Sequence, residues 1–434
     1  MLMSFSVENF RSIRSRQEIT FVPDGRQREN SDNTSVAGDR NQYQGLSAVI
    51  LFGRNASGKS NLLLALRAFQ VLVTSSIHTS IGETIRQHSP FLLDYSNNVL
   101  PSTFVLDFVA HDTLRYQYMI SVFSESVAEE SLHVYHSAKP TMIFHRSNAD
   151  GNSVTFGVGV IGQKNIVKSQ LLKNQLALSK GANSNLKALI APYEFIARMK
   201  FPGFDWTKSE TVDSIRTDNP FLNFDSSNGA GEMFIAMKAA TDPNIIPFLN
   251  QLLKAADTSI ESLITSYEEK SSDDNGIPTS FTGGISTVHK SNFGPVIFPS
   301  QRESDGTRRL LTLGALIYDA FQDGLLLVVD EIDKSLHPAI SRFLISLFNN
   351  SALNLNGAQL VATSHDVTLL DEQLLRRDQI YFVEKEREST EVYRLSDISG
   401  VRKGSNICDL YTAGRFGATP RVGVISPLSP KTKK

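Results

Sequence analysis

Residues 49–69 constrain the fold of this chain more than any other feature. They read VILFGRNASGKSNLLLALRAF and contain the spacing of a phosphate-binding loop, G-x-x-x-x-G-K-S. The apolar run Ala48–Phe52 predicts a buried strand before the loop, and the leucine-rich run Asn61–Phe69 predicts a packed helix after it. A strand, a glycine loop and a helix in this order hold phosphate, because the backbone N–H groups of the loop and the helix dipole both point at the anion.

The residues predicted to bind phosphate form one unbroken run. They are Gly53, Arg54, Asn55, Ala56, Ser57, Gly58, Lys59, Ser60 and Asn61. We expect Lys59 to reach the β- and γ-phosphates of a nucleotide and Ser60 to hold Mg²⁺. The alternative is a glycine-rich turn with an incidental lysine, which the flanking strand and helix disfavour.

Composition sets broad limits. A chain of 434 residues exceeds one ordinary core, so we expect an ATPase domain and at least one further lobe. The single cysteine, Cys408, excludes an internal disulfide and a zinc site with several cysteines, and we interpret it as a small buried residue. No apolar run approaches the roughly 20 residues that span a bilayer, and the first residues lack signal-peptide features. We therefore expect a cytoplasmic protein without membrane contact.

The charges of the chain are nearly balanced. A net charge of −2 and a pI near 6.5 give no overall electrostatic case for nucleic-acid binding, and a local basic patch stays an open alternative. The clearest basic run lies at residues 431–434, which we interpret as a solvated, disordered tail.

The chain divides into two ATPase-like ends and a middle without diagnostic motifs. We predict an N-terminal half of the ATPase head at residues 1–125 and a C-terminal half at 293–400. An inserted β and helical lobe, a candidate for assembly or partner contacts, is predicted at 126–292. A C-terminal extension follows at 401–434.

Local patterns fill in this outline. Turn formers predict a long surface loop at 23–45, and apolar residues at helical spacing predict several helices within 165–265. Residues 266–292 are polar and glycine-rich, which predicts a mobile connection or the tip of a hairpin. Residues 165–265 show no sustained heptad repeat, which argues against a long coiled-coil arm. Alternation predicts strands at 5–10, 17–22, 103–109, 116–122, 131–135, 141–145 and 154–160.

The second half carries two further motifs. Ser304, Gly306 and Thr307 stand where a helix begins, with basic residues just inside it, and this pattern fits either an anion site or an ordinary serine cap. Next, an apolar strand ends in Asp330 and Glu331. A buried strand that delivers Asp330 at its end can place it next to phosphate-bound Mg²⁺, and Glu331 stands where a water-positioning or general-base carboxylate belongs. Acid pairs after strands also occur as helix caps.

A third strand, Gln359–Ser364, ends at His365. A lone histidine is usually structural. At the end of a strand in a phosphate-loop protein, however, His365 can donate a hydrogen bond to a γ-phosphate, and we favour that interpretation.

The order of these motifs resembles the ABC-type ATPases related to SMC, Rad50 and RecF. The motifs are the phosphate loop, Ser-x-Gly-Thr-x-Arg, the Asp-Glu strand, Asp-x-Ser-Leu-His-Pro and Thr-Ser-His. The segments LHP and GTRRLL are similar to those in the ATPases of bacterial phage-defence systems, including the RloA, AbiL, Septu, PARIS and OLD groups. The resemblance implies an α/β fold: a P-loop NTPase head with a mixed sheet, flanking helices, an antiparallel β lobe and an inserted, mainly helical lobe.

The resemblance also implies roles for individual residues. Two heads would sandwich ATP and Mg²⁺, with Ser60 and Asp330 on the metal, Glu331 polarising water and His365 sensing the γ-phosphate. Ser304, Gly306 and Thr307 would contact the γ-phosphate on the opposite head, and Asp333 would lie in the D-loop at the interface. The Asn-Phe-Arg-Ser opening would place Arg11 and Ser12 near the adenine or ribose.

Several positions depart from the pattern or extend it. Asp305 occupies a place where many relatives carry glycine or another small residue, and Gln87 is a weak candidate for the glutamine loop. The ending LYTAGRFGATP resembles that of the RloA and AbiL type, and Gly414 and Gly417 within it predict a packed turn docked on the head. No Toprim-like acidic cluster or HNH pattern follows His365, so we expect any nuclease activity to reside in a separate protein.

Three functions follow as hypotheses. The first is a slowly hydrolysing ATPase, a homodimer or larger assembly, that serves as sensor and scaffold of an anti-phage, abortive-infection system and controls a separate toxic effector such as a nuclease. The second is a RecF-like or Rad50-like DNA-maintenance ATPase that binds DNA directly, with salt-dependent affinity. The third, the nucleotide-binding half of a transporter, lacks support, because the insertion is large and no membrane-coupling signature is visible.

Overall fold

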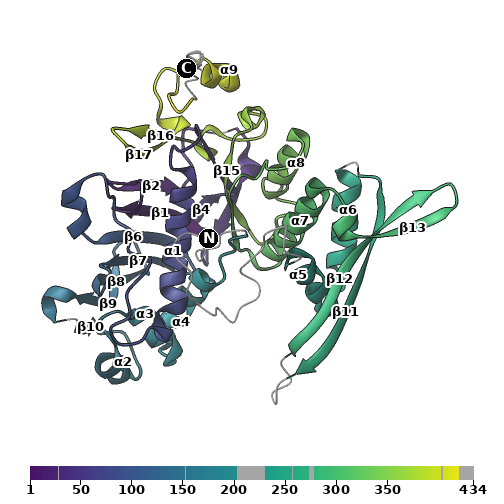
Figure 1. Ribbon diagram of the computed structural model, residues 1–434. Helices are drawn as coiled ribbons and strands as arrows, with labels where there is room; N and C mark the ends of the chain where they lie inside the picture. The colour runs from purple at the N-terminus through teal and green to yellow at the C-terminus, as the bar shows by residue number, and fades with distance from the viewer. Residues whose placement is uncertain are drawn as a thin grey trace, which may run out of the picture.

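The computed structural model describes residues 1–419 except 28, 152, 203–229, 257, 273–277 and 402–403. Two sheets form its body, and a third projects from it (Figure 1). The basic run predicted to be a solvated tail lies outside the described residues.

A five-stranded sheet carries the phosphate loop. Its order is β14 (Leu326–Val329), β15 (Gln359–Ser364), β5 (Ala48–Phe52), β16 (Ile380–Glu386) and β17 (Ser389–Arg394). The first four strands are parallel and β17 is antiparallel. Every residue of β5 is buried, as expected for a parallel strand covered on both faces.

The two faces of β5 enter two separate hydrophobic cores. Val49 and Leu51 pack on the side of α1, whereas Ala48, Ile50 and Phe52 pack on the side of α7. This alternation follows from the two-residue period of a strand. The sheet therefore forms the wall between the two halves of the molecule.

An antiparallel sheet lies on the α1 side. Its seven strands, in spatial order, are β10 (Val154–Phe156), β9 (Thr141–Ser147), β8 (Val127–Tyr135), β7 (Arg115–Val122), β6 (Ser102–Val109), β1 (Leu2–Glu8) and β2 (Gln17–Thr20). The helices here are α1 (Lys59–Ser75), α2 (Lys164–Gln170), α3 (Ala177–Asn183) and α4 (Lys187–Ala197). By length and hydropathy, the helical run Lys59–His78 could cross a membrane, but 61% of its apolar window is buried as the core helix of this domain.

Helices cover the other side of the parallel sheet, and the projecting sheet packs on two of them, α5 (Ala230–Thr241) and α6 (Ile245–Ala255). Further helices on this side are α7 (Asp305–Asp323) and α8 (Pro338–Phe348). The projecting sheet has the order β11 (Ile260–Ser272), β12 (Pro278–Ser291) and β13 (Gly294–Pro299). In Figure 1 its long strands extend away from the body beside α5 and α6.

The last helix within the described residues, α9 (Ile407–Thr412), packs on β16. The Phe382 ring stacks on Tyr411 at 5.3 Å and on Phe416 at 5.1 Å between ring centroids. The docking predicted for the GRFGA segment is therefore observed. In Figure 1 this segment forms the top of the molecule, away from the projecting sheet.

The structure differs from the sequence-based outline in two places. The loop predicted at 23–45 contains a two-stranded sheet, β3 (Thr34–Ala37) and β4 (Tyr43–Leu46), whose polar residues hid the pairing. The lobe predicted at 126–292 is divided, because β8 pairs with β7 and so continues the antiparallel sheet, whereas α5, α6, β11 and β12 lie on the α7 side. Of the two alternatives for 266–292, the structure shows the hairpin.

A buried ion pair fixes α3 to the antiparallel sheet. Glu130 and Arg146 are almost fully buried, with 3.7 Å between Oε2 and Nη1. The Glu130 carboxylate also accepts hydrogen bonds from the backbone N–H groups of Ala177 and Leu178 and from the Tyr118 hydroxyl, at 2.8–3.0 Å. Burial raises the pKa of Glu130, and the Arg146 charge and these hydrogen bonds oppose that shift.

We predict that Glu130→Ala lowers the free energy of unfolding by about 3 kcal/mol, because Arg146 would stay buried without its counter-charge. The measurement is urea unfolding followed by circular dichroism. Glu129→Ala, which removes the neighbouring exposed carboxylate, is the matched control and should leave the midpoint nearly unchanged. Equal effects of the two substitutions would contradict the prediction.

Candidate functional site

The parallel sheet brings the predicted catalytic groups to one edge. Ser364 is in register with Phe52, and Ala362 with Val329, so three strands end together. The residues that follow these strands are the glycine that opens the phosphate loop, Asp330 with Glu331, and His365. Strand register alone therefore assembles motifs that lie far apart in the sequence.

The phosphate loop is wrapped around its own lysine. Lys59 Nζ donates hydrogen bonds to the carbonyl oxygens of Gly53 at 2.7 Å and Arg54 at 3.2 Å. Burial lowers the pKa of Lys59, and the nearby carboxylates of Asp330, Glu331 and Asp333 oppose that shift. The ammonium group thus lies inside the loop, on the side where the acidic residues converge.

Gly58 stands at the tightest point of the loop. Its φ is +108°, and a Cβ at this position would lie 2.0 Å from Thr390 Oγ1. Helix α1 begins at the next residue, Lys59. Ser57 Oγ is buried and has no hydrogen-bond partner among the described residues. A glycine cradle, an orphaned hydroxyl and a lysine at a helix N-terminus are the donors that bind phosphate, so the site fits the β- and γ-phosphates of a nucleotide.

Ser12 and Asn61 lie behind the loop and hold it in place. Asn61 Nδ2 donates to Ser12 Oγ at 2.7 Å, and Ser12 Oγ lies 2.8 Å from Thr390 Oγ1. Thr390 in turn donates to the carbonyl oxygen of Ser57 at 2.9 Å. Ser12 is therefore the middle of a chain of hydrogen bonds that connects the first turn of α1 and β17 to the backbone of the loop.

Arg11 has an unusual backbone conformation, with φ at +51°. Its N–H donates to the carbonyl oxygen of Ser89 at 2.6 Å, and its guanidinium lies 5.9 Å from the centroid of the Phe10 ring. Arg11 does not line the pocket at the loop, nor does Gln87, which is buried near the end of α1. The glutamine-loop candidate is thus not brought to this pocket.

Thr363 organises the two acidic residues. Its hydroxyl donates to Asp330 Oδ1 at 2.5 Å and accepts from the N–H of Glu331 at 2.7 Å. Arg309 of α7 donates to the carbonyl oxygens of Asp330 at 3.2 Å and Glu331 at 2.9 Å. Glu331 has φ at +49°, a conformation that persists only when surrounding contacts enforce it.

His365 is tied to the segment that follows Glu331. The backbone N–H of His365 donates to both carboxylate oxygens of Asp333, at 3.2 and 3.3 Å. Asp333 thus connects the end of β15 to the turn before α8.

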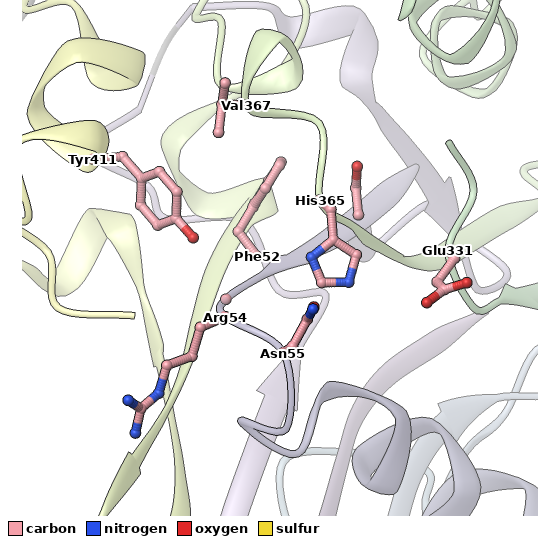
Figure 2. A pocket seen from close by; sticks show the side chains of 9 residues that line it. Phe52, Arg54, Asn55, Glu331, His365, Val367 and Tyr411 are labelled. Atoms are coloured by element: carbon pink, nitrogen blue, oxygen red, sulfur yellow. The ribbon is translucent and has the colours of Figure 1, made fainter. Parts of the chain in front are cut away.

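A cavity of about 690 Å³ lies at this edge of the sheet (Figure 2). Figure 2 shows the His365 ring between Asn55 and Glu331 in this view, whereas the Arg54 side chain extends away from Glu331. Tyr411 closes the opposite end, with its hydroxyl bonded to the carbonyl oxygen of Ala418 at 3.1 Å. The lining residues are Phe52, Gly53, Arg54, Asn55, Glu331, Ser364, His365, Val367 and Tyr411.

Ser304, Gly306 and Thr307, called the signature residues from here on, lie outside this cavity's lining. Ser304 caps α7: its Oγ accepts from the N–H of Thr307 at 3.1 Å and lies 2.9 Å from Thr307 Oγ1. Gly306 packs against the turn before α8, since a Cβ there would lie 2.6 Å from the carbonyl oxygen of Ser335. The structure therefore brings the phosphate loop, Asp330, Glu331 and His365 together but leaves Ser304, Gly306 and Thr307 on a separate exposed turn.

Sequence reasoning missed three contributors to the site. Thr363 lies near the end of a predicted strand, one residue before Ser364, and this position is a signal that sequence reasoning could have used. Thr390 and Tyr411 gave no local signal, because their importance comes from β17 and the C-terminal segment folding back on the phosphate loop.

A family described as "AAA domain, putative AbiEii toxin, Type IV TA system" matches residues 48–371. No curated protein matches the chain. Among solved structures, the chain is similar to an SMC head bound to the C-winged helix domain of ScpA, at 11% identity and a TM-score of 0.46, over 91% of this chain and 97% of that one.

Two further structures are similar to it. The SMC head of Thermotoga maritima has 11% identity and a TM-score of 0.40, over 91% of this chain and 98% of that one. The recombination mediator RecF with ATP has 12% identity and a TM-score of 0.38, over 90% and 97%. These likenesses are low, and the family match and the strand order carry the fold assignment: the predicted α/β ATPase fold is confirmed.

We predict that Gly58→Ala destabilises the protein at least twice as much as Gly82→Ala. Both positions have positive φ, but a Cβ at Gly82 meets nothing within 4 Å, whereas one at Gly58 collides with Thr390. Gly82→Ala should therefore cost only the backbone strain, about 1 kcal/mol. Thermal unfolding measures both, and equal shifts would contradict the described packing of the loop.

Proposed function

This chain belongs to the AbiEii-type AAA domain family, and on that premise we propose that it binds ATP with Mg²⁺ and hydrolyses it slowly. The observation that carries the proposal is one cavity lined by the start of the phosphate loop, by Glu331 and by His365, with Asp330 held beside Glu331 by the Thr363 hydroxyl. Each group has a chemical property that hydrolysis requires, and each is fixed by contacts from a different element.

Lys59 would supply the positive charge for the phosphates. Before nucleotide binds, the carbonyl oxygens of Gly53 and Arg54 hold the ammonium group in place. When phosphate binds, Lys59 would donate to the phosphate oxygens instead. Ser60 and Asp330 would hold Mg²⁺, which supplies charge neutralisation when bound. The bond from Thr363 orients the Asp330 carboxylate for this role.

Glu331 would act as the general base that orients and deprotonates water. Two interactions support this role, because Thr363 and Arg309 fix the backbone of Glu331 while its side chain faces the cavity. His365 would donate a hydrogen bond to the γ-phosphate from its place opposite the loop. Holding both groups before substrate arrives reduces the reorganisation that the reaction needs.

We further propose that a second copy completes the site. Ser304, Gly306 and Thr307 form an exposed turn with an N-terminal helix dipole and lie outside the lining of the cavity in the same chain. A head-to-head dimer would bring this turn to the phosphates of the opposite head, with Asp333 near the interface. The two heads would then close on ATP and separate after hydrolysis.

The biological role that we propose is defence against phage. The family description names a putative AbiEii toxin of a type IV TA system, and the GRFGA ending is similar to that of defence ATPases. In this role the dimer acts as a sensor and scaffold that controls a separate effector, such as a nuclease. Direct DNA maintenance is the competing outcome of the test below.

We expect Lys59→Ala to lose Mg-ATP affinity, because the phosphates lose their main cation. Glu331→Gln should bind ATP normally but hydrolyse it at least about a hundredfold more slowly, because the general base is lost. Binding is measured with a fluorescent ATP analogue and turnover by phosphate release. Lys187→Ala, at an exposed position in the first turn of α4, is the control for loss of a lysine. Wild-type turnover in both Lys59→Ala and Glu331→Gln would overturn the site assignment.

The defence role is tested by native mass spectrometry of tagged Glu331→Gln protein, expressed with its neighbouring genes, with and without Mg-ATP. We expect an ATP-dependent assembly of at least two copies that carries a second polypeptide. A dimer without a bound protein, together with salt-sensitive DNA binding, would overturn the defence role in favour of DNA maintenance.

A further inference from the structure

Glu303 directly precedes the signature serine and is anchored in a different part of the fold. Its Oε1 lies 2.6 Å from His289 Nε2 and accepts a hydrogen bond from the Thr287 hydroxyl. Both partners belong to β12, the central strand of the projecting sheet. The turn that leads into α7 is therefore attached to that sheet by a side chain.

This anchor lies in a largely buried part of the sheet, where β12 is paired on both sides. Thr287 is fully buried and pairs with Leu263 of β11 on one side and Phe298 of β13 on the other. The side chains of His289 and Glu303 are 19% and 10% exposed. A carboxylate this shielded from water needs hydrogen-bond donors, and the two on β12 meet that need.

The anchor also determines where the next residue lies. Ser304 is the N-cap of α7, and its hydroxyl bonds to the N–H of Thr307. The segment before it is a short turn, closed by a bond from the N–H of Glu303 to the carbonyl oxygen of Ser300 at 3.0 Å. A displacement of β12 would thus move Glu303 and, through one peptide unit, the cap itself.

We propose that Glu303, held by Thr287 and His289, is a positioning residue that sets the conformation of the Ser304–Thr307 turn and links the projecting sheet to ATP hydrolysis. This inference rests on the proposed function, in which that turn contacts ATP on the opposite head. It predicts that the sheet controls turnover without changing how a single head binds nucleotide.

The test compares Thr287→Val, which removes the hydroxyl at nearly constant volume, with Thr287→Ser, which keeps it. Thr287→Val should lower kcat about tenfold or more, because small misplacements of reacting groups have effects of this size, while Mg-ATP affinity stays within about twofold. Thr287→Ser should restore most of kcat. Lys290→Ala, an exposed change on the same strand, is the control and should behave as wild type.

A readout independent of turnover is hydrogen exchange at the amide of Thr307 in the absence of nucleotide. Exchange should accelerate in Thr287→Val and in Glu303→Ala, but not in Thr287→Ser or Lys290→Ala. Thermal unfolding confirms that each variant is folded. A folded Thr287→Val protein with unchanged kcat and unchanged exchange would overturn the inference.

The two levels of the proposal fail differently. If the wild-type protein neither binds nor hydrolyses Mg-ATP, the proposed function is wrong and the link to hydrolysis falls with it. If the wild type hydrolyses ATP and Thr287→Val loses affinity in proportion to kcat, only the positioning role of Glu303 is wrong.

Discussion

The parallel pairing of β15 with β5 and β14 is the constraint on which the rest of the structure depends. It aligns the ends of three strands and so places the phosphate loop, the acidic pair and His365 at one edge. The pairing also carries Thr363 between the two acidic residues, where its hydroxyl bonds to both. A shift of one register in β15 would send Thr363 to the opposite face and disconnect Asp330 from its support.

The site is supported from both sides of the sheet by elements that do not touch the cavity. Ser12, from the segment between β1 and β2, and Thr390 of β17 hold the phosphate loop from one side. Arg309 holds the acidic residues from the side of α7, which is also the helix that begins at the signature turn. One helix thus contacts the backbone of Glu331 in its own head and presents Ser304 at its exposed end.

Sequence patterns predicted the parts of the site that depend on local chemistry. The glycine loop, the acidic pair and His365 each follow a buried strand, and the parallel order places them together. The support residues were not predictable in this way, because Thr390 and Tyr411 act through contacts across more than three hundred residues of sequence. The helical lobe was predicted as one unit because the sequence between 126 and 292 shows local periodicity, which does not reveal that β8 pairs with β7 or that α6 packs on α7.

The central position of β5 has a consequence for how the protein is made. This strand leaves the ribosome more than three hundred residues before its two hydrogen-bonding neighbours, β15 and β16. Until residue 364 has left the ribosome, both edges of an entirely apolar strand have no native partner, and one edge has none until residue 386 has followed. Such edges favour aggregation. Over this interval the edges of β5 stay open, and the phosphate loop gains His365 as a neighbour only when β15 pairs with β5.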